Sequence, residues 1–206
     1  MTNLIDIFVL TKQYDKQFRE FLDGTRTIMP LPPSTDSLYN LLSTELNKIK
    51  TISDEIIYHP ARYKILFGAS ASIDLQATFK VVKNSEIVIS DNDVKSKVVS
   101  AINEFFAIDN WDFGDNFYFT ELSTYVMNKL ATNIVNFLIV PKKPGLSFGS
   151  LLEIRAEKDQ IFVNGATIDD IEIISSVTAS RIKSIGNISY TPGYTVQQTI
   201  ISAGNE

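Results

Sequence analysis

The fold of this chain is organised around the stretch Asp109-Asn-Trp-Asp-Phe-Gly-Asp-Asn-Phe-Tyr-Phe119. Before it, apolar residues recur at helical spacing from Val94 to Phe106, and after it they do so from Leu122 to Leu130. Ser90 and Asp93 have the spacing of a capping box, so the first helix is predicted to begin there. We therefore expect an aromatic corner between two helices.

Five aromatic side chains of this corner are candidates for the core or for an interface. They are Trp111, Phe113, Phe117, Tyr118 and Phe119. Aromatic side chains bury large areas and dominate the energetics of both environments. In one interpretation they clamp the two helices onto a sheet, and in the other they anchor a contact between subunits. Both interpretations imply a structural role.

The corner also carries three carboxylates, at Asp109, Asp112 and Asp115, a residue type that suits a hard cation such as calcium. The register of an EF-hand fails, because Trp111 and Phe113 stand where oxygen donors are required. We interpret the acids as turn formers and helix caps, with an irregular calcium site as the alternative. No metal or cofactor is assigned.

Upstream, residues 1–89 are predicted to form a lobe in which strand, helix and strand follow one another. Leu4 to Lys12 has the pattern of a strand, Gln13 to Phe21 favours a short helix, and residues 36–50 favour an amphipathic helix. Apolar and polar residues alternate from Ile73 to Val81, which is typical of a strand with one wet face. A hairpin is therefore expected near residues 61–83.

Downstream, residues 90–184 are predicted to form a lobe of two helices and a sheet. Ile134 to Val140 is almost continuously apolar and is expected to be a strand buried on both sides. Short strands are expected at 151–155, 161–163 and 167–174, the last two joined by a two-residue hairpin at Asn164-Gly165. Residues 185–206 are expected to form an extended arm or tail. The predicted class is α+β, with antiparallel or mixed sheets and about three amphipathic helices.

The composition excludes several functions. The 206 residues are 44% hydrophobic, which is enough to bury a core without disulfides. A net charge of −5 with no basic cluster disfavours nucleic acid as a partner. No apolar run reaches the roughly 18 residues of a membrane span, so no membrane partner is expected. The absence of cysteine excludes thiol catalysis and zinc–thiolate sites, and it suits assembly in a cytoplasm.

The sharpest enzyme hypothesis is a serine hydrolase, because Gly145-Leu-Ser-Phe-Gly149 matches a nucleophile elbow with Ser147 at its centre. The only histidine, His59, precedes the serine, whereas elbow proteins place the histidine after it. Residues 151–155 also alternate like a strand where a helix should begin. We therefore expect no catalytic residues and a protein that is not an enzyme.

Several stretches resemble the C-terminal region of the baseplate wedge protein of T-even-type contractile-tail phages. The resemblance covers most of residues 4–184. It rests on residues 57–60, 66–69, 105–122, 125–127, 137–141, 147–154 and 161–171, and the Trp-containing run is its most specific part. Residues 90–140 also resemble, more distantly, the baseplate J-like architecture. The family member is much longer, so the chain would correspond to its C-terminal portion.

The resemblance implies a late virion protein of the tail baseplate that is assembled in the host cytoplasm. Copies would form a homodimer, link neighbouring wedge subunits into the ring around the hub, and rearrange when the tail contracts. The family brings no catalytic residues. A different structural or adhesive virion module is the alternative.

Overall fold

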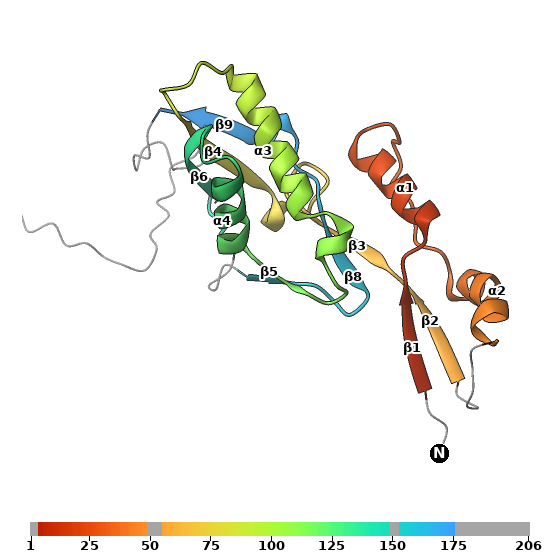
Figure 1. The fold of residues 1–206 in the computed structure, drawn as a ribbon. Helices are drawn as coiled ribbons and strands as arrows, with labels where there is room; N and C mark the ends of the chain where they lie inside the picture. Colours follow the sequence, from red (N-terminus) through yellow and green to blue (C-terminus); the bar gives the residue numbers. More distant parts are fainter. Residues whose placement is uncertain (1–3, 49–54, 149–152, 176–206) are drawn as a thin grey trace, which may run out of the picture.

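The computed structural model describes residues 4–48, 55–148 and 153–175, which form an α+β fold (Figure 1). The arm predicted at residues 185–206 lies outside these ranges. The α-helices in the described ranges are α1 (Lys12–Leu22), α2 (Thr35–Leu46), α3 (Asp91–Phe105) and α4 (Phe119–Lys129). Short 3-10 turns are η1 (Ile73–Leu75), η2 (Ile108–Asn110) and η3 (Ile168–Asp170).

The strands pair in both directions, so the sheets are mixed. They are β1 (Leu4–Val9), β2 (Glu55–Pro60), β3 (Arg62–Leu66), β4 (Ala77–Lys83), β5 (Asn116–Tyr118), β6 (Ile134–Pro141), β7 (Glu153–Arg155), β8 (Gln160–Asn164) and β9 (Ile171–Ile174). The pairs β1–β2, β3–β8 and β4–β9 are parallel, whereas β4–β6 and β5–β7 are antiparallel.

The main core lies between the sheet β6-β4-β9 and the helices α3 and α4, which cover the same face of it (Figure 1). The apolar stripes of the two helices point into this core. They supply Val94, Val98, Ile102, Leu122 and Val126, all of them buried. Phe79 and Val81 of the central strand β4 meet these side chains and are fully buried. Helical periodicity and β alternation therefore place their apolar faces against each other, as predicted.

The strands β2 and β3 form one nearly continuous strand that changes partners at Ala61. The Ala61 N–H donates to the carbonyl of Val9 in β1 (2.9 Å), and the Arg62 N–H donates to the carbonyl of Asp159 beside β8 (2.8 Å). Successive N–H groups of a strand point to opposite edges. Consequently β1 and β8 lie on opposite edges of this strand, and the strand joins the N-terminal part to the main core.

Two smaller contacts complete the N-terminal part. Helix α1, capped by the Thr11 side chain, packs Tyr14 and Phe18 against Ile65 and Val163 of β3 and β8. Helix α2, which begins after Ser34, packs against β2, where the rings of Tyr39 and Tyr58 lie 6.1 Å apart. The segment at 13–21 is a full helix, so the described part of the chain has four helices rather than about three.

The hairpin predicted near residues 61–83 is wrong. Strand β3 pairs with β8, and β4 pairs with β6 and β9, so the two strands have separate partners. The chain turns away after β3 because Phe67 and Gly68 adopt positive φ angles of 65° and 67°. The alternating segment also begins as η1, and the strand starts only at Ala77. These pairings cross the predicted boundary between residues 89 and 90.

The hairpin predicted at Asn164-Gly165 is also wrong, because β8 and β9 belong to different sheets. The Asn164 side chain accepts the Ala166 N–H (2.9 Å), and the Gly165 N–H donates to the carbonyl of Leu66 (2.8 Å). A capping box between Thr167 and Asp170 then forms η3 before β9 starts. Local side-chain bonds thus redirect the backbone, as Asn and Thr commonly do.

Strand β6 differs from its prediction as well. It is an edge strand of the sheet β6-β4-β9, and Val135 on it is 59% exposed. The prediction of burial on both sides is therefore wrong for this strand. Continuous apolar runs cannot by themselves distinguish a central strand from an edge strand whose one face is well covered.

Candidate functional site

The aromatic corner, residues 109–119, connects α3 to α4 as predicted. After α3 ends at Phe105, η2 and a turn at Gly114 (φ 78°) lead into the short strand β5. This strand pairs antiparallel with β7, and Phe119 begins α4 at once. The corner is thus tied to both helices and to a second strand.

Phe117 and Phe119 belong to the core. Phe117 is fully buried. Its ring contacts nearby rings of the chain and two that come from distant segments, Phe67 and Phe162. The nearby rings are Phe105, Phe106, Trp111 and Phe119. The ring of Phe119 stacks on that of Phe148 with 4.4 Å between centroids. Neither side chain is available to a partner.

Trp111 fastens the end of α3. Its indole N–H donates to the carbonyl of Phe105 (2.9 Å), one of the carbonyls that a helix leaves without an intrahelical partner at its C-terminus. Its ring stacks on Phe106 at 5.5 Å and meets the ring of Phe162 edge-on at 5.1 Å. The polar and apolar parts of the indole are therefore both used inside the corner.

Phe113 and Tyr118 are the two members of the predicted set that reach the surface. Tyr118 is 36% exposed on β5. Phe113 is half-buried, and its ring centroid lies 6.1 Å from that of Phe8 in β1. The corner is therefore mainly a core element, and Phe113 connects it to the N-terminal strands.

Of the three acids of the corner, Asp115 forms a local hydrogen bond. The Asp115 carboxylate accepts the backbone N–H of Asp112 (2.8 Å), and Asp109 lies in η2. In residues 4–48, 55–148 and 153–175, no three His, Cys, Asp or Glu side chains come close enough together to hold a metal ion. The geometry of Asp115 is that of a turn former.

The two residues of the serine hydrolase hypothesis, His59 and Ser147, do not form a catalytic pair. His59 Nε2 is hydrogen-bonded to the Asp6 carboxylate (2.7 Å), and its ring stacks on Phe8 at 5.1 Å. Ser147 is exposed and follows a turn at Gly145 (φ 87°) after β6. Both residues are described, and no hydrogen bond joins them. Strand β7 follows at Glu153, which differs from the helix that an elbow requires.

The β1–β2 pair is a two-stranded sheet with one face covered by α2 and the other largely exposed. Its residues alternate between two faces, and the face that includes Tyr58 is covered by α2. The other face carries Leu4, Asp6, Phe8 and His59. Leu4 is 56% exposed, whereas Phe8 is half-buried beside Phe113. Parallel sheets are normally covered on both faces, and two-stranded sheets are marginal in water. This surface is therefore the best candidate for a contact with another chain.

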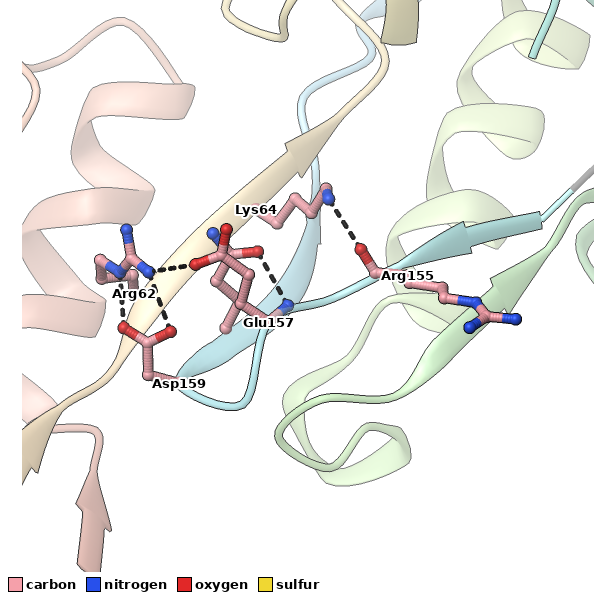
Figure 2. A network of polar contacts seen from close by, with 6 residues as sticks. Arg62, Lys64, Arg155, Glu157 and Asp159 are labelled. Carbon is pink, nitrogen blue, oxygen red and sulfur yellow. Dashed lines mark hydrogen bonds and ion pairs between the residues drawn. The ribbon is translucent and has the colours of Figure 1, made fainter. Parts of the chain in front are cut away.

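A cluster of charges holds the joint between this pair and the main core (Figure 2). The Arg62 guanidinium donates to both carboxylate oxygens of Asp159 (2.6 and 2.9 Å) and to Glu157 (2.6 Å). Beside them, Lys64 Nζ donates to the carbonyl of Arg155 (2.7 Å). The bonds from Arg62 lower the pKa of Asp159 and raise the pKa of the guanidinium itself.

Sequence reasoning found β1 and the corner but missed both the open face and the charge cluster. The partners in the cluster lie 95 and 97 residues apart in the chain, so no local motif could reveal them. One sequence signal did indicate an exposed strand edge. Leu4 to Val9 alternates only imperfectly and contains neither lysine nor proline, the residues that often protect an exposed edge.

Within the described ranges, every helix is too short or too polar to cross a bilayer. No protein-family model matches the chain, and a comparison with curated proteins gives no match.

Proposed function

We propose that this chain is a structural component of a phage tail baseplate wedge. It forms a homodimer and contacts neighbouring wedge subunits, and in this way it links wedges into the ring around the central hub. The Trp-containing run and the other stretches named above support this proposal by their resemblance to the wedge family. No step of the proposed role requires catalysis, a cofactor or a metal.

The observation that carries the proposal is the open face of the β1–β2 pair. Within the described residues, this pair leaves Leu4 exposed on one face and backbone groups unpaired along the outer edge of β1, which is unfavourable unless an assembly covers them. The neighbouring part of the molecule is built for rigidity. Phe67, Phe106 and Phe117 interlock at centroid distances of 5.3–6.1 Å, and the Arg62 cluster fastens the strand that leads to the open face. A surface held in this way suits a contact that transmits mechanical force between subunits.

Two measurements test the proposal. Light scattering across a range of concentrations should give the mass of a dimer, and a strict monomer at every concentration would contradict self-association. Immunogold labelling of purified virions with an antibody against the chain should mark the tail end distal to the head. Label on another part of the virion would favour a different structural or adhesive module, and unlabelled virions would refute a virion role.

A further inference from the structure

In the part of the chain that the structure describes, β1 pairs only with β2, and the backbone groups on its outer edge are arranged to accept another strand. The carbonyl of Val9 accepts the Ala61 N–H and so points towards β2. Because N–H and C=O groups alternate between the two edges, those of Ile5 and Ile7 also point towards β2, while those of Asp6 and Phe8 point outward. Among the described residues, Figure 1 shows no helix or strand along this outer edge of β1.

Strand β1 has few of the devices by which sheet edges avoid one another. Its sequence, Leu-Ile-Asp-Ile-Phe-Val, contains no lysine or proline, and its register with β2 runs without a bulge. Its one charged side chain, Asp6, is hydrogen-bonded to His59 on the open face. The edge is therefore both apolar and regular, which favours strand addition.

We propose that β1 pairs antiparallel with β1 of a second copy of this chain, across a twofold axis at Ile7. The result is a continuous four-stranded sheet in the order β2-β1-β1-β2. The inference rests on the homodimer of the proposed function and assigns the surface and register by which it forms. A twofold contact of this kind uses the same patch on both copies, so it closes after two.

The position of the Asp6 carboxylate and the number of paired residues together select the register. A centre on Ile7 pairs residues 5–9 of each copy, all of them within β1, and sets Asp6 opposite Phe8. A centre on Asp6 pairs residues 4–8, but it places two carboxylates directly opposite each other, which is destabilising. Centres on Ile5 or Phe8 pair only residues 4–6 or 7–9. The Ile7 register is thus the longest one that opposes no like charges.

The absence of cysteine from the chain makes the register directly testable. With outward groups on Asp6 and Phe8, the two Ile7 residues form a non-hydrogen-bonded pair, in which Cα atoms lie about 4.5 Å apart. That separation is within the range of a disulfide. Under mild oxidation, Ile7→Cys should give about tenfold more covalent dimer than Val135→Cys, an exposed β-branched position on the edge strand β6.

A second pair of variants tests the same register independently, in case Ile7→Cys does not fold. In the same register Ile5 lies opposite Val9 of the other copy. Ile5→Cys and Val9→Cys should each stay monomeric in denaturing gels when oxidised alone, and they should form a heterodimer when mixed before oxidation. Far-UV circular dichroism confirms that each variant is folded before oxidation.

The outcomes separate this inference from the proposed function. A wild-type dimer in which neither Ile7→Cys nor the mixed pair crosslinks above Val135→Cys would overturn the β1 pairing and leave the homodimer standing. Crosslinking of Ile5→Cys alone would overturn the register. A wild-type monomer without crosslinks would overturn self-association and leave the β1 edge to a strand of another protein.

Discussion

Gly68 lies directly against the backbone of Gly165, so that a Cβ atom on Gly68 would sit 1.8 Å from the Gly165 carbonyl oxygen. The contact places the end of β3 against the end of β8. It is reinforced by the hydrogen bond from the Gly165 N–H to the carbonyl of Leu66. Gly68 also has a φ of 67°, a backbone angle that residues other than glycine rarely adopt.

Gly68→Ala is expected to destabilise the protein by roughly 3 kcal/mol or more, because two backbone segments would have to separate. Gly24→Ala is the matched control. Gly24 also has a positive φ (82°) but has open space around it, so its alanine variant should lose only about 1 kcal/mol from backbone strain. Urea unfolding followed by circular dichroism measures both values. Equal losses would show that strain, and not the close contact, sets the cost.

Phe117→Ala should cost about 3–5 kcal/mol, because it opens a cavity where Phe67, Phe106 and Phe162 converge. Its neighbour Tyr118 is 36% exposed, and Tyr118→Ala should cost no more than about 1 kcal/mol. The free energies of unfolding in urea provide the comparison. A small loss for Phe117→Ala would contradict its place at the centre of the core.

Trp111→Phe is expected to keep the ring packing of the corner but to remove the bond from the indole N–H to the carbonyl of Phe105. The expected loss is about 1 kcal/mol. Trp111→Ala should lose several times more, since the contacts with Phe106 and Phe162 also go. Trp111 is the only tryptophan of the chain, so the variants are followed by circular dichroism rather than by fluorescence. A neutral Trp111→Phe would mean that another group satisfies this carbonyl.

The Arg62–Asp159 contact predicts an acid-dependent contribution to stability. Hydrogen bonds from Arg62 hold the pKa of Asp159 lower in the folded chain than its value of about 3.9 in an unfolded one. The stabilisation is therefore complete above that unfolded value and is lost as the pH falls through the lower, folded pKa. Arg62 is 45% exposed, so the contribution at pH 7 should be only about 1 kcal/mol.

Asp159→Asn should therefore be less stable than the wild type at pH 7, with the difference shrinking as the pH falls below about 4. Arg62→Gln should show the same trend, and the double variant should lose less than the sum of the two single losses. Urea unfolding at a series of pH values measures all three. A difference that stays constant with pH would show that the loss does not arise from the charge of Asp159.

Local sequence patterns were sufficient to predict the helices on either side of the corner. Ser90 does cap α3, because its hydroxyl accepts the Asp93 N–H (3.1 Å), and the apolar stripe that follows points into the core as its spacing predicts. The corner and the α+β class could be predicted for the same reason. Helix caps, helical periodicity and strand alternation depend on neighbours within a few residues.

The pairing of the strands depends on contacts between segments that are distant in the sequence. Local sequence patterns could therefore not predict it. Alternation from Ile73 to Val81 predicted a hairpin between β3 and β4, yet the partner of β3 is β8, because Phe67 and Gly68 turn the chain and the backbone of Gly165 meets it there. The salt bridge of Arg62 to Asp159 follows from that pairing. Local preferences thus account for the elements, whereas the choice of neighbours, and with it the exposed edge, follows from packing across the whole chain.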